Sequence, residues 1–263
     1  MFRTIELPDE RFVSENLTPI TVKSRALGRR ADMTLWCPDS VRGKHNVPII
    51  ILLHGVYSSH WAWALKGGAH RTAAKLLATG ELPDCILAMP SDGLIGDGSG
   101  YVRSAFGNAE SWIAHEVPLA VAAACDEAGP DSPIFIAGLS MGGFGALRLG
   151  AKYPDIFKAM SAHSAATHFE QLTHITEESE DAYAVAAEDS SVLATMLARR
   201  DTLPPFRFDC GESDSLFPAN IALHKQLLDA QIPHEFTAND GGHDWPYWEK
   251  HLADSLRFFA ARM

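Results

Sequence analysis

The sequence predicts an α/β protein with a mostly parallel central sheet, and three of its features support this prediction. Apolar, strand-like runs alternate with helical patterns from residue 47 to the end of the chain. A hairpin pattern precedes them, and a G-x-S-x-G pattern joins one apolar run directly to a helix. Such alternation is typical of parallel sheets with helices on both faces. We therefore expect one domain over residues 1–263, with an antiparallel hairpin on its N-terminal side.

Length and composition suit such a domain. Apolar residues make up 46% of the 263 residues, enough for a substantial core, and the 21% of charged residues argues against extensive disorder. The net charge of −11 argues against nucleic acid or an anionic membrane as a partner, because both need a basic surface. Neither a signal-peptide core nor an apolar run of membrane-spanning length is seen. We expect a cytoplasmic protein.

The four cysteines predict no disulfide framework. Cys37, Cys85, Cys125 and Cys210 are widely spaced and form no C-x-x-C pair. Most of them lie in apolar runs or helical patterns, so we interpret them as buried free thiols in a reducing compartment rather than as bridges of a secreted protein. No cofactor or metal is expected.

The predicted elements follow the chain in a simple order. Residues 18–27 and 31–36 alternate with period two around Gly28, which predicts the hairpin. Continuous apolar runs are typical of strands buried on both faces, and they cover residues 47–53, 84–89, 134–137, 156–161, 206–210 and 233–237. Helical patterns occupy residues 61–79, 108–127 with a kink expected at Pro118, the stretch after Ser140, 220–230 and 245–261.

Two further segments are predicted to lie near the ligand side of the sheet. Residues 91–100 contain four glycines and two aspartates and must form a loop at the carboxyl end of a strand. Asp92 and Asp97 lack the ligand spacing of a calcium loop, so a solvated turn is expected. Residues 165–202 form a helical, polar insertion that should cross above the strand ends and line a pocket. Its acidic run, residues 177–181, should face solvent.

Ser140 is the predicted nucleophile. Gly138-Leu139-Ser140-Met141-Gly142 lies between a strand and a helix, which is the nucleophile-elbow signature. Side chains two residues before or after the serine would collide with the strand and the helix, and glycine has none. The turn lifts the hydroxyl clear of the sheet and directs the positive end of the helix dipole toward a bound group.

A serine nucleophile needs a base, and the base needs an acid that holds its tautomer. On this type of sheet both should follow the serine, on loops at later strand ends. For the acid we favour Asp214 over Asp209, which lies within a strand, and over Glu212, which directly follows the turn. Of the 12 histidines, His243 alone follows the acid on a glycine-rich strand-end loop. His163 is its closest rival.

Two backbone N–H groups should stabilise an oxyanion. One belongs to Met141, the residue after the nucleophile, and the other to Val56, which follows Gly55 in an early strand-end loop. Aromatic side chains near the strand-end loops are predicted to line the substrate pocket, with ordinary core packing as the alternative for each. They are Tyr57, Trp61, Trp63, Tyr101, Phe217 and Trp245.

Five stretches carry a resemblance to a known family. They are LLHG (52–55), MPSDG (89–93), AGLSMGGFGAL (137–147), CGESDSLF (210–217) and GGHDWPYWEKHL (241–252). With them the chain resembles the esterase D-type α/β-hydrolases, which include tributyrin and feruloyl-type esterases, S-formylglutathione hydrolases and, more distantly, mycolyltransferases. The resemblance implies an α/β-hydrolase fold with a Ser140–Asp214–His243 triad and oxyanion donors at Val56 and Met141. The early loop lacks the cysteine of the glutathione-hydrolase branch and is more similar to the simple carboxylesterases.

These observations predict a serine carboxylesterase that hydrolyses short-chain acyl, aryl or sugar esters through an acyl-enzyme. The alternatives are acyl transfer to a sugar or other alcohol with the same triad, and an S-formylglutathione-type thioesterase. A non-catalytic binding module is disfavoured by the intact triad. The expected partner is a small-molecule ester, and the oligomeric state stays open, a homo-oligomer included.

Overall fold

In residues 2–263, which the computed structural model describes (backbone alone at residue 180), nine strands form one sheet in the order β1-β2-β3-β5-β4-β8-β9-β10-β11. The six strands from β5 to β11 in this order run parallel, whereas β1, β2 and β3 pair antiparallel with their neighbours. The mostly parallel sheet with an antiparallel N-terminal part is therefore confirmed. The strands are β1 Ile5–Glu6, β2 Leu17–Lys23, β3 Arg30–Trp36, β4 Ile49–Leu53, β5 Ile86–Pro90, β8 Ile134–Leu139, β9 Phe157–His163, β10 Phe206–Gly211 and β11 Glu235–Asn239, with a separate pair β6 Arg103–Ser104 and β7 Gly107–Asn108.

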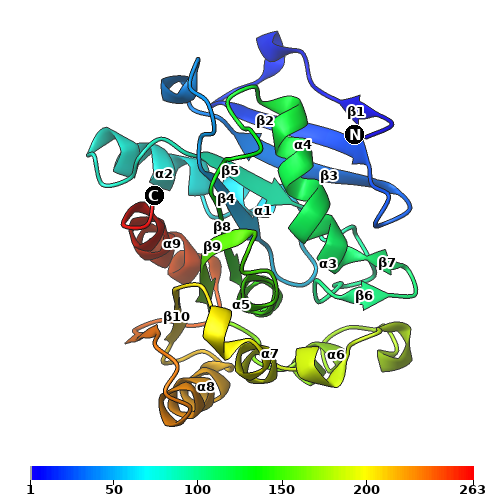
Figure 1. Cartoon of the computed structure of the whole chain (residues 1–263), viewed down its shortest axis with the longest axis vertical. Coiled ribbons are helices and arrows are strands. Elements are labelled where there is room, and N and C mark those ends of the chain that lie inside the picture. Colours follow the sequence, from blue (N-terminus) through cyan, green and yellow to red (C-terminus); the bar gives the residue numbers. More distant parts are fainter. Residues whose placement is uncertain (1) are drawn as a thin grey trace.

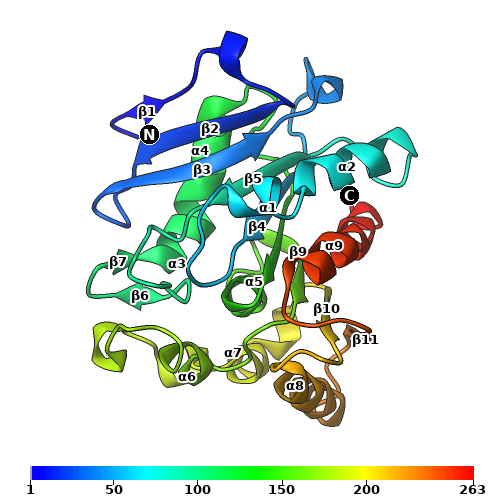
Figure 2. The ribbon, with the colours of Figure 1, turned by 180° about the vertical axis from the view of Figure 1, so that it is seen from behind.

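Helices cover both faces of this sheet (Figures 1 and 2). One face packs against α3, α4, α5, α7 and α8 through a large apolar core, and the other packs against α1, α2 and α9 through a second core. The central strands β4 and β8 contribute side chains to both cores, which explains why their sequences are apolar without interruption. The helices are α1 Ala62–Leu65, α2 Ala69–Ala78, α3 Ala109–Ser111, α4 Val117–Ala124, α5 Met141–Lys152, α6 Glu170–Thr173, α7 Val192–Ala198, α8 Phe217–Asp229 and α9 Trp245–Ala260.

The N-terminal hairpin ends earlier than the alternating pattern predicts. β2 stops at Lys23, because the next residues form a loop closed by side-chain hydrogen bonds. Ser24 Oγ accepts from Leu27 N–H at 3.0 Å, and Glu116 accepts from Ala26 N–H at 3.1 Å. Apolar residues at the end of the predicted strand therefore pack inside a loop.

Two predicted helical segments depart from a single regular helix. Residues 61–79 contain two helices, α1 and α2, which are divided at Gly68, whose φ of +57° favours glycine. The helix expected over residues 108–127 contains a π-helical turn, Trp112–Glu116, directly before Pro118. Proline has no N–H to donate and its ring crowds the preceding turn, so the widened turn lies where the kink was predicted.

The insertion, residues 165–202, is less helical than its sequence pattern suggests. It contains α6, α7 and three short 3₁₀ turns, Glu180–Ala182, Ala187–Asp189 and Arg200–Thr202. Backbone bridges from His168 to Ser191 and from Ser104 to Tyr183 tie it to itself and to the β6–β7 pair. Figure 1 shows it beside α5, at the same end of the molecule as α8. Tertiary contacts rather than helix propensity therefore shape this segment.

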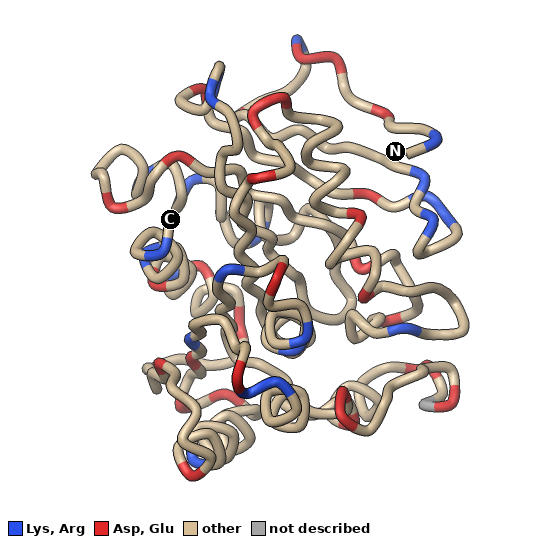
Figure 3. The backbone as a smooth tube through the Cα atoms, viewed as in Figure 1, with Lys and Arg blue, Asp and Glu red and all other residues tan. Residues whose placement is uncertain are grey.

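Charges are spread over the molecule. Figure 3 shows acidic and basic residues interspersed along loops and helices in all parts of the coloured trace. Within residues 2–263, every helix falls short of the length or the apolar character needed to cross a membrane.

Candidate active site

Ser140 lies at the elbow between β8 and α5, with φ of 53° and ψ of −120°. A non-glycine residue adopts this backbone region only under strain, which is stored where the surrounding structure enforces it. A Cβ on Gly138 would lie 2.1 Å from the carbonyl oxygen of Gly142, and a Cβ on Gly142 would lie 2.3 Å from that of Leu53. Both glycines are therefore required by the close approach of backbone to backbone, as the sequence pattern predicts.

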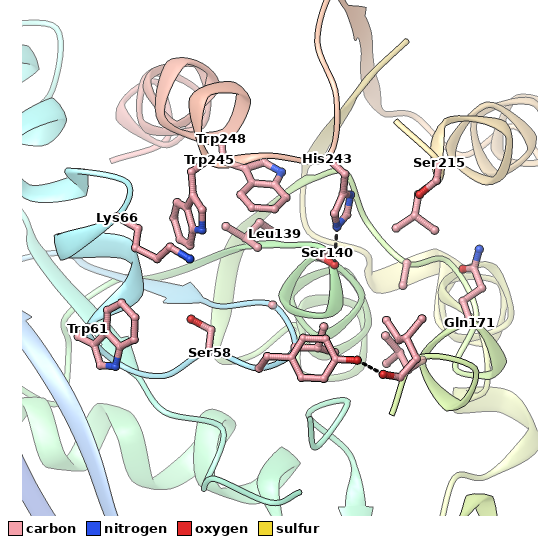
Figure 4. Close-up of a pocket in the computed structure, with 17 residues that line it drawn as sticks. Ser58, Trp61, Lys66, Leu139, Ser140, Gln171, Ser215, His243, Trp245 and Trp248 are labelled. Carbon is pink, nitrogen blue, oxygen red and sulfur yellow. Dashed lines mark hydrogen bonds between the residues drawn. The ribbon is translucent and has the colours of Figure 1, made fainter. Parts of the chain in front are cut away.

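The structure brings together the three polar side chains that the sequence analysis selects. His243 Nε2 lies 3.0 Å from Ser140 Oγ, and His243 Nδ1 lies 2.9 Å from Asp214 Oδ2 (Figure 4). A carboxylate can only accept, so Nδ1–H donates to Asp214 and Nε2 is left to accept the Ser140 hydroxyl proton. β8, β10 and β11 deliver the three residues to one edge of the sheet, because the carboxyl ends of parallel strands meet there.

Asp214 is held as a carboxylate. Its side chain is fully buried, and burial by itself would raise its pKa. Hydrogen bonds from His243 and from the Leu216 N–H, the latter at 2.8 Å, outweigh that effect and lower the pKa of Asp214 below its ordinary value. An ionised acceptor is the form that orients the imidazole.

The rival acid and base lie in a different network. His163 Nδ1 lies 2.9 Å from Asp209 Oδ2, and the same carboxylate accepts from Tyr247 Oη–H at 2.8 Å and pairs with Arg207 at 2.8 Å. His163 and Asp209 are completely buried and do not line the cavity beside Ser140. This network joins β9, β10 and α9, so its role is structural support of the strands that carry the site. Glu212 is exposed to solvent.

The residues predicted as oxyanion donors flank Ser140. Val56 lines the cavity, and Met141 begins α5, so its N–H belongs to the first turn, which has no intrahelical acceptor. A Cβ on Gly55 would lie 3.7 Å from Ser140 Oγ, which shows how closely the early loop approaches the serine. Tyr57, which follows Val56, donates its N–H to the Asp97 carbonyl at 2.8 Å and so fixes the loop after β4.

Residues 91–100 form the outer support of that early loop. Asp92 accepts from Leu94 N–H at 3.0 Å and from Ser99 N–H at 2.8 Å, so the aspartate closes the loop from within. His54 Nε2 accepts from Asp92 N–H at 3.2 Å. A Cβ on Gly98 would lie 2.6 Å from the Met141 sulfur, so the loop passes close to the first residue of α5. The loop of residues 91–100 therefore packs against the early loop and the start of α5, and the solvated turn expected from the sequence is not found.

Beside Ser140 lies a cavity of about 530 Å³ with mostly apolar walls. Of the aromatic residues predicted to line it, Tyr57, Trp61 and Trp245 do so. Tyr101 does not: it is completely buried and donates its hydroxyl to the His54 carbonyl at 2.9 Å, so it is a core residue. Phe217 does not either, because the turn from Asp214 into α8 presents Ser215 and Leu216 to the cavity instead. Trp63 is also a core residue: it is buried and donates its Nε1–H to the Leu53 carbonyl at 2.9 Å.

The insertion, which is expected to line the pocket, supplies four residues to the cavity wall, and six others that the sequence does not single out also line it. They are Ser58, Lys66, Leu139, Ala166, Gln171, Leu172, Ile175, Ser215, Leu216 and Trp248. Trp248 could have been found from its spacing, since it follows Trp245 by three residues and shares a face of α9 with it. Ala166, Gln171, Leu172 and Ile175 belong to the insertion, whose place in the chain predicts that it lines the pocket. Lys66 carries no local signal, because only the packed chain places it in the cavity wall.

The insertion is attached to the early loops by polar contacts. Tyr57 Oη–H donates to the Ile175 carbonyl oxygen. Asp97 accepts from Glu177 N–H at 2.9 Å, and the Glu178 carboxylate accepts from Asp97 N–H at 3.1 Å. The sequence predicts that the acidic run faces solvent. Glu177 and Asp181 do so, whereas Glu178 is half-buried. The side chain at residue 180 lies outside the described part. The insertion, residues 165–202, therefore forms one wall of the cavity.

In the described part of the chain, histidine, cysteine and acidic side chains form no group of three or more that could hold a metal ion.

The chain has an α/β-hydrolase fold. The sheet order, the helices on both faces and the serine at a strand–helix elbow show it, and the solved structures that the chain resembles support it. The chain matches the Esterase family model, described as "Putative esterase", over residues 24–259, and it belongs to that family. The family resemblance drawn from the sequence is therefore confirmed.

Three relatives illustrate the likeness. A ferulic acid esterase superposes with a TM-score of 0.82 at 26% identity, with 94% of this chain and 98% of that chain covered. A substrate-bound, fluorophosphonate-binding serine hydrolase F (FphF) of Staphylococcus aureus superposes with a TM-score of 0.77 at 21% identity, covering 92% and 97%. An acetyl esterase of Caldicellulosiruptor saccharolyticus is 31% identical over 143 residues, and the matched stretch spans 48% of this chain and 54% of that relative.

Proposed function

We propose that the protein is a serine esterase that hydrolyses carboxylic esters of small molecules through an acyl-enzyme intermediate. The observation that carries this proposal is the hydrogen-bonded order Ser140–His243–Asp214 with the serine open to a mostly apolar cavity. The Esterase family match and the relatives named as ferulic acid esterase and acetyl esterase support the ester as substrate.

In the first half of the reaction, Ser140 Oγ attacks the ester carbonyl while His243 Nε2 takes the hydroxyl proton. Negative charge develops on the carbonyl oxygen, and the N–H groups of Val56 and Met141 donate to it. Each such donor contributes about 3–4 kcal/mol of transition-state stabilisation in comparable sites. Asp214 stabilises the imidazolium and keeps its orientation.

In the second half, the protonated His243 gives its proton to the departing alcohol, which leaves the acyl group on Ser140 Oγ. A water molecule then transfers one proton to His243 Nε2 and attacks the acyl carbonyl. The tetrahedral intermediate expels Ser140 Oγ, which recovers the proton from His243, and the carboxylic acid is released. Tyr57, Trp61 and Trp245 line the same cavity, and they contact the bound substrate, with Trp61 away from the scissile bond.

The test replaces the nucleophile alone. Ser140→Ala should fold normally and lose turnover of p-nitrophenyl acetate, and a fluorophosphonate probe should label Ser140 in the parent. Ser215→Ala is the matched control, because Ser215 lines the same cavity but forms no part of the hydrogen-bonded chain. Turnover retained in Ser140→Ala, together with labelling of another serine, would overturn the proposal.

A further inference from the structure

Lys66 is distinctive among the residues that line the cavity beside Ser140. Within the described part of the chain, no other lysine, and no arginine, aspartate or glutamate, contributes to the cavity wall. The chain as a whole carries 33 acidic and 22 basic residues, so its net charge is negative. The charge that Lys66 brings to the cavity wall is therefore opposite in sign to the net charge of the protein.

The position of Lys66 is set by an aromatic cluster. Its Nζ lies 5.4 Å from the centroid of the Trp245 ring, which is a cation–π distance. The Trp245 ring is itself packed tightly: a Cβ on Gly67 would lie 2.8 Å from it, and Trp63 and Trp248 meet it edge to face at 5.8 and 5.3 Å. Figure 4 shows the Lys66 side chain directed toward Trp245 and the space beside Ser58.

The ammonium group has no acidic partner in the described residues. Lys44 pairs with Asp84, and Lys152 pairs with Glu110 and Asp189, whereas no such ion pair involves Lys66. An unpaired cation above an indole, at the wall of a mostly apolar cavity, keeps its capacity to bind an anion. Lys66 is exposed to solvent at the rim of the cavity, so its attraction for an anion is partly screened and should depend on salt.

We propose that Lys66 binds a carboxylate on the ester substrate, with the body of the substrate lying between Trp61 and Trp245. This inference rests on the proposed esterase function and names its substrate class: esters whose acyl or alcohol part ends in a carboxylate remote from the scissile bond. The protein's net charge of −11 repels anions elsewhere, so Lys66 supplies the local attraction that selects them.

The test compares matched esters that differ only in this charge. The acyl pair is p-nitrophenyl hydrogen glutarate and p-nitrophenyl pentanoate, and the alcohol pair is 4-acetoxybenzoate and its methyl ester. In Lys66→Met the KM of the charged member of at least one pair should rise about threefold to tenfold, with its neutral partner unchanged. Lys66→Arg should retain the preference, and Lys75→Met, which removes an exposed lysine of α2 outside the cavity, should resemble the parent.

A binding measurement separates this inference from the esterase proposal. Tryptophan fluorescence of Ser140→Ala, titrated with glutarate and with 4-hydroxybenzoate, should show binding of at least one of them. That binding should weaken when Lys66→Met is added and when salt is raised. Failure of all ester turnover with this binding intact would overturn only the esterase. Equal KM changes for charged and neutral esters in Lys66→Met, or no change for either, would overturn the role of Lys66.

A separate observation concerns two cysteines far from the cavity beside Ser140. Cys37 follows β3 and Cys125 follows α4, 88 positions apart, yet their sulfur atoms lie 3.2 Å from each other. Both line a second cavity of about 620 Å³, whereas Cys85 and Cys210 are completely buried elsewhere. The hydrogen bond donated by Cys37 lowers the pKa of Cys125, which favours the thiolate needed for attack on a disulfide. This bond outweighs burial and the Glu127 carboxylate, which both oppose the thiolate; Cys125 Sγ–H donates to that carboxylate at 3.1 Å.

We infer that Cys37 and Cys125 are joined reversibly when a small disulfide such as oxidised glutathione is present. The Cys125 thiolate attacks one glutathione sulfur, forms a mixed disulfide and releases one glutathione. Cys37 then attacks the Cys125 sulfur and releases the second, so two cysteine thiols are oxidised and one glutathione disulfide is reduced. The bond needs the sulfurs to close from 3.2 Å to about 2 Å, a small side-chain rotation.

The test treats the protein with oxidised glutathione under native conditions and counts thiols after denaturation. Two of the four thiols should disappear, with a mass loss of two hydrogens, a Cys37–Cys125 peptide and a higher midpoint of thermal unfolding, because the bond restrains a long loop of the unfolded chain. Cys85→Ser should behave as the parent, and Cys37→Ser should not form the bond. A stable glutathione adduct in the parent, or a full count of thiols, would overturn the inference.

Discussion

The indole of Trp248 meets the imidazole of His243 edge to face, with ring centroids 5.0 Å apart and ring planes at 88°. Trp248 is almost fully buried and is packed in turn against Trp245. The contact limits rotation of the imidazole about its side-chain bonds, while Asp214 fixes one of its nitrogen atoms. Packing and hydrogen bonding together therefore keep Nε2 directed at Ser140.

Trp248→Ala should lower kcat about tenfold to hundredfold with a smaller change in KM, because small misplacement of a catalytic group is costly to the rate. Trp248→Phe, which keeps an aromatic edge, should retain most of the rate. Trp61→Ala is the contrasting variant: Trp61 lines the cavity away from His243, so it should change KM more than kcat. Steady-state kinetics with p-nitrophenyl acetate measure both constants. Unchanged kcat in a folded Trp248→Ala would show that Asp214 alone orients the base.

Gly142→Ala should destabilise the fold by about 1–3 kcal/mol or prevent folding, because overpacking at close backbone contacts forces the chain apart. A Cβ there would lie 2.3 Å from the Leu53 carbonyl oxygen, which belongs to the central strand and cannot move alone. Gly242→Ala is the matched control, since a Cβ there meets its nearest atom at 3.9 Å. Urea unfolding compares the two variants, and equal stabilities would contradict the steric account of the elbow.

Leu172→Ala and Ile175→Ala should shift the preference among acyl chain lengths toward longer chains, because each removes apolar volume from the cavity wall. Val185 and Leu193 lie in the same insertion but outside the cavity, so Val185→Ala and Leu193→Ala should leave the preference unchanged. A series of p-nitrophenyl esters of increasing acyl length measures the effect. The same preference in all four folded variants would show that the insertion does not limit the substrate.

Glu110 should make the protein sensitive to acid. Burial would raise its pKa, but Arg148, Tyr153 and Lys152 hold it at about 2, below the ordinary 4.5. A carboxylate with a lowered pKa stabilises the fold fully above its unfolded pKa and loses that contribution as pH falls. The loss should therefore run from about 4.5 down to about 2 and amount to roughly 2–3 kcal/mol.

Glu110→Gln should be less stable at neutral pH and should show a shallower loss of stability between pH 5 and pH 3, measured by urea unfolding at each pH. Glu81→Gln is the control, because Glu81 forms an exposed pair with Arg257 that water screens. If Glu110→Gln lost stability between pH 5 and pH 3 as steeply as the parent, the ion pairs of Glu110 would not be the cause of the acid sensitivity.

The sequence by itself determined the features that depend on local sterics and on chain order. The elbow is one of them: Gly138 and Gly142 are readable as requirements because the collisions they avoid arise within a few residues or against the neighbouring strand. Asp214 and His243 could be chosen over Asp209 and His163 because each follows a strand end after the serine. The uninterrupted apolar runs likewise revealed strands buried on both faces.

Only the tertiary structure decided which distant side chains share the cavity. The sequence predicts Tyr101 and Phe217 as pocket residues, but neither lines the cavity. Tyr101 is held in the core by its hydrogen bond to His54, and the turn before α8 directs Phe217 away from the cavity. Lys66 joins the cavity wall only through packing between segments. Chain order predicts that the insertion lies over the strand ends, but packing decides that Leu172 and Ile175 line the cavity. Such contacts between residues far apart in the chain leave no periodicity or motif, because no local steric or hydrophobic rule specifies them.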